Sequence, residues 1–132
     1  MIFLDASFII SYFLKKHEDH KRTAELWEKY EDKERIISNL IIAEVSNVLH
    51  SRLKVNFELT QKVFKFMSND LILLDDTSYY QYALDIMNSF YSVTRVPFFD
   101  CVYMALTEDY GINKMLSLDS HFDLNKNIKM IF

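Results

Sequence analysis

The scarcity of residues that break regular structure constrains this chain more than any other feature. Its 132 residues contain one glycine, Gly111, and one proline, Pro97. All-β and loop-rich folds need many tight turns, and those turns depend on the φ angles that glycine and proline supply. Half of the residues are hydrophobic, so the chain can bury a substantial core. We therefore expect a single domain, residues 1–132, built largely from long helices.

Short apolar runs alternate with segments of helical periodicity along the whole chain. The expected strands cover residues 2–5, 35–38, 71–75, 114–118 and 128–132. The expected helices cover residues 6–15, 17–31, 39–54, 57–68, 77–91 and 98–110, with Asn39, Asn56 and Thr77 as N-terminal caps and Gly111 as a stop. Because helical connections favour parallel strands, the expected fold is a three-layer α/β/α sandwich with a central, mostly parallel sheet of about five strands.

The location of the protein is predicted from its N-terminus and its cysteine content. Cys101 is the only cysteine, so no intrachain disulfide can form. The apolar N-terminal stretch is split by Asp5 and ends at Lys15, which is shorter than the roughly 20 residues of a membrane span. It also lacks the basic start of a secretory signal. We expect a cytoplasmic protein that does not enter a membrane.

Four acidic residues occupy positions where a parallel α/β sheet binds its ligands. Asp5 and Asp119 each follow an expected strand, Asp100 lies in the first turn of the last helix, and Glu44 lies one turn into another helix. Ligands of such sheets collect at the carboxyl ends of the strands. The order strand, acid, helix therefore predicts that these four side chains share one edge of the sheet.

Each acid also has an ordinary structural explanation. Asp5 and Asp119 can cap helices, and Asp100 can complement a helix dipole. Glu44 is different, because it interrupts the apolar face that carries Ile41 and Val48. A buried carboxylate must be paired with a lysine or arginine, protonated or bound to a metal ion. Four converging carboxylates suit a hard cation such as Mg²⁺ or Mn²⁺, and no set of His and Cys residues has zinc spacing.

Four sequence motifs carry a resemblance to a known family. They are "IFLDAS", "ISNLIIAEVSNVL", "PFFDCVYMALTEDYGI" and "MLSLDSHF". In this order, they resemble the motifs of the PIN-domain family of metal-dependent ribonucleases, and in particular VapC-type toxins of type II toxin–antitoxin pairs. There are two departures: Ser117 stands where the family often has threonine, and Cys101 stands where a small residue is common. The resemblance covers essentially the whole chain.

The resemblance implies a site and a reaction. Asp5, Glu44, Asp100 and Asp119 would hold one or two Mg²⁺ or Mn²⁺ ions, and Ser7 and Ser117 would support them by hydrogen bonding. Asp123 lies near a position that sometimes adds a further acid. The implied reaction is endonucleolytic hydrolysis of RNA phosphodiester bonds, with water as the nucleophile and no covalent enzyme intermediate. A protein antitoxin and a second copy of the chain are the implied partners.

Two other functions compete with a ribonuclease. A receiver-like signalling domain, phosphorylated on aspartate, needs a pair of acids after one strand, and "FLDAS" lacks that pair. Such a domain also has no place for Glu44 in mid-helix. A non-catalytic interaction module with the same fold would have lost one of the four acids, and all four are present. The net charge of −4 argues against a protein that coats nucleic acid by bulk charge, but less against a nuclease with an acidic cation site.

Several other residues have weaker functional interpretations. His17 and His20 can ligate a metal, although we favour solvated side chains. His121 adjoins Asp119 and can lie near the site, although we favour a surface role. Asp75 and Asp76 are expected to cap the helix at residues 77–91 together with Thr77. The aromatic clusters "SYYQY" and "SFYSV" can stack on bases, although we favour a dimer face. Candidate phosphate contacts are Lys15, Lys16, Lys21, Arg22, Arg52, Lys54 and Arg95.

Overall fold

A five-stranded, all-parallel sheet forms the centre of the domain, as expected from the sequence. The computed structural model describes residues 1–125 and 129–132. The strand order is β3-β2-β1-β4-β5. The strands are β1 (Ile2–Leu4), β2 (Arg35–Ser38), β3 (Ile72–Leu74), β4 (Lys114–Leu116) and β5 (Lys129–Ile131). The first residue of the expected last strand, residue 128, lies outside the described residues.

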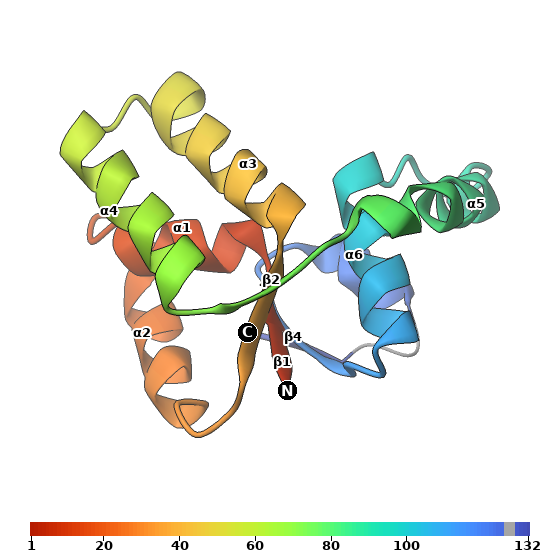
Figure 1. Ribbon diagram of the computed structural model, residues 1–132, viewed down its shortest axis with the longest axis horizontal. Helices are drawn as coiled ribbons and strands as arrows, with labels where there is room; N and C mark the ends of the chain where they lie inside the picture. Colours follow the sequence, from red (N-terminus) through yellow and green to blue (C-terminus); the bar gives the residue numbers. More distant parts are fainter. Residues whose placement is uncertain (126–128) are drawn as a thin grey trace.

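Helices cover both faces of this sheet and give the expected three layers. The helices are α1 (Ala6–Phe13), α2 (His20–Lys29), α3 (Asn39–Asn47), α4 (Phe57–Asn69), α5 (Tyr80–Phe90) and α6 (Phe98–Asp109). Three shorter turns accompany them: a π-helical turn, η1 (Val48–Arg52), and two 3₁₀ turns, η2 (Thr77–Tyr79) and η3 (Ser120–Leu124). Figure 1 shows α1–α4 on one side of the sheet and α5 and α6 on the other. None of the helices in the described part of the chain is long and apolar enough to cross a membrane.

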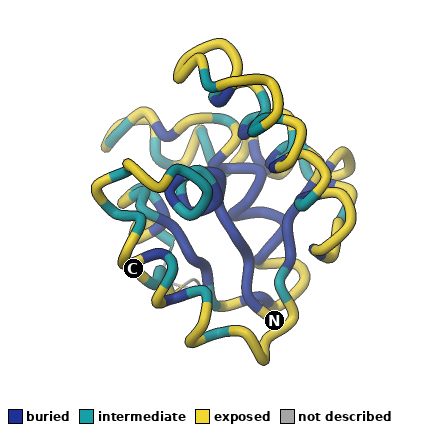
Figure 2. The backbone as a smooth tube through the Cα atoms, turned by 90° about the vertical axis from the view of Figure 1, so that its left-hand side faces the viewer, coloured by how far each residue is buried: buried dark blue, intermediate teal, exposed yellow. Residues whose placement is uncertain are grey.

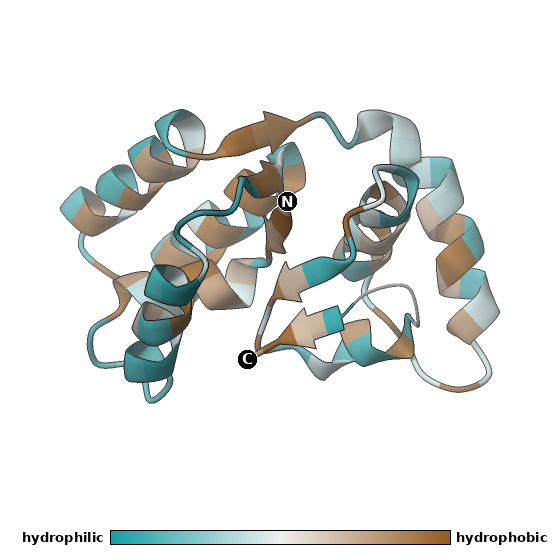
Figure 3. Ribbon diagram, turned by 90° about the horizontal axis from the view of Figure 1, so that it is seen from below, coloured by the Kyte–Doolittle hydropathy of each residue, from teal (hydrophilic) through white to brown (hydrophobic). Residues whose placement is uncertain are grey.

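The core lies between these layers. All three residues of β1 are fully buried, and Figure 2 shows the strands as the buried interior beneath exposed helices and loops. Figure 3 shows the N-terminal strand at the hydrophobic end of the scale. Helix α6 is buried at every position from Asp100 to Thr107. A helix that is buried all round is fixed by packing on every side, so α6 holds Asp100 rigidly beside the sheet.

The long helix expected at residues 39–54 is divided. It continues as α3 to Asn47 and then widens into the π-helical turn η1, in which the Leu53 N–H donates to the Val48 carbonyl over 2.9 Å. The apolar periodicity runs unbroken through this point, so the sequence pattern does not reveal the change. Such π-turns often occur at functional sites, and η1 borders the site described below.

Two of the expected caps are different in the structure. Asn56 does cap α4, since its side chain accepts from the Leu59 N–H. Asn39 instead accepts from the Asp76 N–H, while Asp76 accepts from the Leu40 N–H in the first turn of α3. Asp76 therefore caps a helix 36 residues away in sequence. Thr77 begins the short turn η2 and donates to Asp75, so it does not cap a long helix.

Candidate active site

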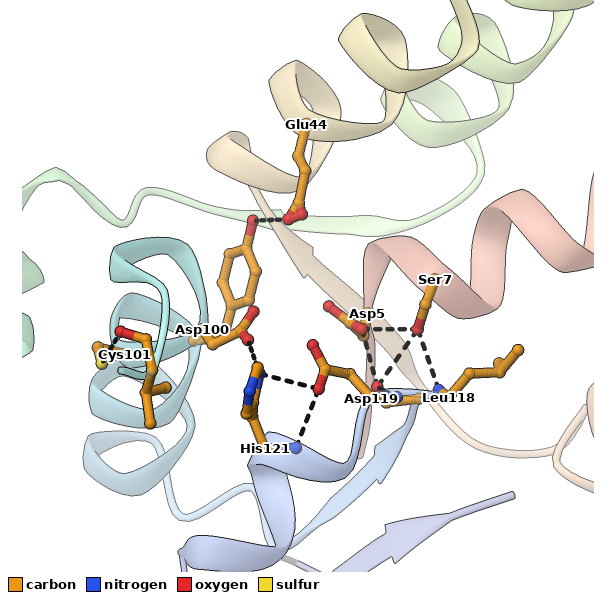
Figure 4. Close-up of polar contacts among 11 residues, drawn as sticks. Asp5, Ser7, Glu44, Asp100, Cys101, Leu118, Asp119 and His121 are labelled. Atoms are coloured by element: carbon orange, nitrogen blue, oxygen red, sulfur yellow. Dashed lines mark hydrogen bonds and ion pairs between the residues drawn. The ribbon is translucent and has the colours of Figure 1, made fainter. Parts of the chain in front are cut away.

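Two of the four acids are brought together by the pairing of neighbouring strands. Strands β1 and β4 lie side by side in the register Leu4 to Leu116, and the Asp5 N–H donates to the Leu116 carbonyl over 3.0 Å. Asp5 follows β1 directly, and Asp119 lies three residues beyond the end of β4. Parallel strands in register end at the same edge, so both carboxylates face one place (Figure 4).

The other two acids come from helices. Carboxylate oxygens of Asp5, Glu44 and Asp100 all lie within 4.8 Å of one another, and Asp100 and Asp119 belong to a second group of the same spacing. These four residues line a cavity of about 310 Å³. Asp5 and Asp100 are buried, whereas Glu44 and Asp119 are half-buried. The structure thus brings together all four acids that the sequence singled out.

Two serines hold Asp5 in place. The hydroxyl oxygens of Ser7 and Ser117 accept from the backbone N–H groups of Leu118 and Asp119, at 3.0 and 2.9 Å. Each hydroxyl has only one proton, and both donate to Oδ2 of Asp5, at 2.7 and 2.8 Å. Because the backbone fixes the direction of both hydroxyl groups, Oδ2 of Asp5 is fully engaged and its orientation is set.

Helix capping and ion pairing, the structural roles considered for these acids, explain only some of them. Asp5 stands at the N-cap position of α1 but makes no side-chain capping bond. Asp119 does cap, accepting from the His121 N–H over 2.9 Å. Glu44 forms no ion pair with a lysine or arginine among the described residues; its Oε1 accepts a long, 3.4 Å hydrogen bond from the Tyr103 hydroxyl. Capping and ion pairing therefore do not account for Asp5 and Glu44.

Crowding of the carboxylates favours their neutral forms in the metal-free protein. Burial raises the pKa of Asp100 to about 9, and the charges of Asp5 and Asp119 add to this effect. Burial, followed by the charge of Asp5, raises the pKa of Glu44 to about 7. Burial also raises the pKa of Asp5, although the hydrogen bonds from Ser7 and Ser117 oppose the change. Burial and the mutual repulsion of the carboxylates thus both disfavour their ionised forms.

One residue of the cluster was considered from the sequence but not favoured for the site. His121, in the turn η3, places its Nδ1 3.1 Å from Oδ2 of Asp100 and 3.0 Å from Oδ1 of Asp119. The expected surface role is therefore wrong. The only sequence signal was its position two residues after Asp119, in a turn whose direction the sequence does not reveal. Asp123 has an exposed side chain and is not among the residues lining the cavity.

A basic residue and an aromatic residue stand on the wall of the same cavity. Arg52, from the turn η1, is the only cationic side chain among the described residues that line it. Phe99, next to Asp100, also lines the cavity and is 42% exposed. Of the seven basic residues considered as phosphate contacts, Arg52 is thus the one that adjoins the acids.

A larger hollow lies elsewhere, between α1, α2 and α4. It measures about 800 Å³, and no carboxylate is among the described residues that line it. His17 and His20 are on its wall, but Nδ1 of His17 accepts from the Asp19 N–H and Nδ1 of His20 meets the Ser11 carbonyl. The larger hollow is therefore not the better candidate for an active site. The smaller cavity contains the carboxylates that could take part in a reaction.

The donor set of the acidic cavity fits a hard divalent cation. Carboxylate oxygens are the ligands that Mg²⁺ and Mn²⁺ prefer. Burial, followed by the charges of neighbouring carboxylates, raises the pKa values of Glu44 and Asp100, and a bound cation would favour their ionised forms. The domain therefore has the fold and the site of a metal-binding α/β domain. Its acidic cluster lies at the carboxyl edge of the parallel sheet, where a divalent cation could assist a reaction.

The chain belongs to the PIN domain family, whose model matches residues 2–127. Among solved structures, it is similar to the toxin VapC20 of Mycobacterium tuberculosis, described as cleaving the sarcin–ricin loop. That match has a TM-score of 0.81 and 17% identity, and it covers 96% of this chain and 95% of the toxin. It is also similar to VapBC2 of Rickettsia felis, bound to a promoter DNA fragment (TM-score 0.70, 15% identity, 99% and 98% coverage). FitAcB of Neisseria gonorrhoeae matches with a TM-score of 0.69 and 11% identity, covering 100% and 97%. No curated protein matches the sequence significantly.

These comparisons establish the fold and the family. PIN domains are typically metal-dependent nucleases, and this chain has an acidic cluster consistent with such an active site. Two of the similar structures are described as VapBC2 bound to promoter DNA and as FitAcB. At identities below 20%, the likeness extends to architecture and not to a particular substrate.

Proposed function

We propose that this protein is an endoribonuclease that requires Mg²⁺ or Mn²⁺ and hydrolyses RNA phosphodiester bonds. The observation that carries the proposal is the convergence of Asp5, Glu44, Asp100 and Asp119 in one cavity, where no described lysine or arginine forms an ion pair with Glu44. In this proposal, the four carboxylates hold the cation, and Ser7 and Ser117 keep Asp5 aimed at it. When bound, the cation supplies a Lewis acid and lowers the pKa of water.

Arg52 and Phe99 support RNA as the substrate. Acidic walls repel the phosphate backbone, so a nuclease of net charge −4 needs a cationic contact beside its acids. Arg52 supplies this contact on the cavity wall. Phe99 offers an exposed ring at the same wall, and aromatic rings stack on unpaired bases. These two residues would orient single-stranded RNA with a phosphate near the carboxylates.

We further propose that the chain is a homodimer and the toxin of a toxin–antitoxin pair, located in the cytoplasm. Strand β3 supports the dimer, because it lies at the edge of the sheet with Ile72 and Leu73 41% and 46% exposed. Tyr82 and Tyr91, from the aromatic clusters of the sequence, are 40% and 59% exposed. An exposed edge strand can pair with another chain, and an exposed apolar patch can mark a protein–protein interface.

The proposal predicts that RNA cleavage depends on an added divalent cation. Purified protein, freed of metal and incubated with a labelled single-stranded RNA, should cut it only after Mg²⁺ or Mn²⁺ is added, because the carboxylates alone cannot stabilise the charge that develops on phosphate. Gel electrophoresis of the fragments measures the effect. Excess EDTA should return cleavage to the background of an identically purified Asp5→Asn protein. Cleavage by the wild-type protein that persists in EDTA contradicts the proposal.

A further inference from the structure

His121 extends the carboxylate cluster with a nitrogen donor. Its Nδ1 faces both Oδ2 of Asp100 and Oδ1 of Asp119, at 3.1 and 3.0 Å (Figure 4). The turn η3 fixes this placement, because the backbone N–H of His121 donates to the same oxygen of Asp119 over 2.9 Å. The side chain is 35% exposed, so it stands at the solvent side of the cluster while Asp100 lies within.

These separations match those between ligands of one ion. Mg²⁺ and ions of similar size bind at about 2.1 Å in octahedral geometry, so two adjacent ligand atoms lie about 3 Å apart. The Nδ1 of His121 has that separation from each of its two acidic neighbours. The same distances also fit hydrogen bonds from a protonated Nδ1, so a bound ion would take the place of that proton between His121 and the two carboxylates.

The cluster divides into two overlapping sets of ligands. Asp5, Glu44 and Asp100 form one set, whose atoms all lie within 4.8 Å of one another. Asp100, Asp119 and His121 form a second set of the same spacing. Asp100 belongs to both and is the buried member between them. The first set offers only oxygen, whereas the second adds an imidazole nitrogen.

We infer that His121 is a ligand of a second cation position, which it forms with Asp100 and Asp119, and that this position selects Mn²⁺ over Mg²⁺. The inference rests on the proposed function, because it assumes that the carboxylates bind a cation. Mg²⁺ strongly prefers oxygen ligands, while imidazole is a good ligand for first-row transition ions. The all-oxygen set of Asp5, Glu44 and Asp100 accepts either ion.

Electron spin-echo modulation of bound Mn²⁺ tests the inference without measuring activity. The wild-type protein loaded with two equivalents of Mn²⁺ should show ¹⁴N modulation from a coordinated imidazole. The modulation should disappear in His121→Asn. This variant keeps the backbone N–H that donates to the capping carboxylate of Asp119. It should persist in the matched control His50→Asn, because His50 is exposed and belongs to neither of the two sets of possible ligands.

Calorimetric titration of the same proteins supplies a second readout. His121→Asn should weaken the binding of one Mn²⁺ by at least about 10-fold and leave Mg²⁺ affinity almost unchanged. Absence of ¹⁴N modulation in wild-type protein that binds Mn²⁺, or its persistence in His121→Asn, overturns the inference and leaves the proposed function standing. Failure of the wild-type protein to bind Mn²⁺ at all overturns both.

Discussion

Replacing Asp5 or Asp100 by asparagine should reduce RNA cleavage by at least about 1000-fold, which corresponds to about 4 kcal/mol of lost transition-state stabilisation. Asparagine has nearly the same shape as aspartate but no negative charge. Asp5 and Asp100 lie in the cavity with oxygen atoms within 4.8 Å of each other and of Glu44. Each variant therefore removes one charge from the centre of the cluster. The rate of cleavage of a labelled RNA at saturating Mn²⁺ measures the loss.

The fold of these variants should be intact, and a matched change elsewhere should have no effect. Neutral asparagine removes repulsion from a crowded site, so circular dichroism and thermal unfolding should show a folded protein. Asp32→Asn is the control. It makes the same chemical change at an exposed residue, in a turn beyond α2. Full activity in Asp5→Asn, or an equal loss in Asp32→Asn, contradicts the assignment of the site.

The second large effect is on thermal stability. Without metal, the folded protein should become less stable as pH rises from about 5 to 9. The folded pKa values of Glu44, about 7, and Asp100, about 9, lie above their ordinary values of 4.5 and 3.8. The folded state therefore binds more protons than the unfolded state in this window, and raising the pH favours unfolding. Differential scanning calorimetry in EDTA at several pH values measures this slope.

Added metal should reverse this loss. At pH 8, a concentration of Mn²⁺ 100 times its dissociation constant adds about 2.7 kcal/mol to the free energy of unfolding. For a domain of this size, that increase raises the Tm by about 10 °C. Glu44→Gln should unfold at a higher temperature than the wild type in EDTA and gain less from Mn²⁺. A Tm that is independent of both pH and Mn²⁺ would mean that the carboxylates are not held together in solution.

Three of the four acids were predictable because the sequence around each shows where it lies in a parallel α/β fold. Asp5 and Asp119 follow apolar runs, and the rule that ligands collect at the carboxyl ends of parallel strands locates them at one edge. Glu44 was found because it interrupts an apolar helix face, which demands an explanation whatever the fold. The alternation of strands and helices similarly predicted the parallel sheet and its layers, both of which the structure confirms.

What the sequence did not reveal depends on contacts between distant segments. His121 reaches Asp100 only because η3 turns toward α6. Asp76 caps α3 because β2 and β3 are paired, which brings their ends together. The apolar run of β3 looks the same as that of a central strand, yet β3 is at the edge of the sheet and partly exposed. In each case, the local sequence pattern predicts the helix, strand or turn. Which other segments it contacts depends on tertiary packing.

Anomalous X-ray diffraction from a crystal soaked in Mn²⁺ tests the cation site most directly. The account predicts a strong anomalous peak in the cavity between Asp5, Glu44 and Asp100, and its absence from an Asp100→Asn crystal soaked in the same way. A well-diffracting wild-type crystal with no anomalous density among these carboxylates at saturating Mn²⁺ would contradict the account.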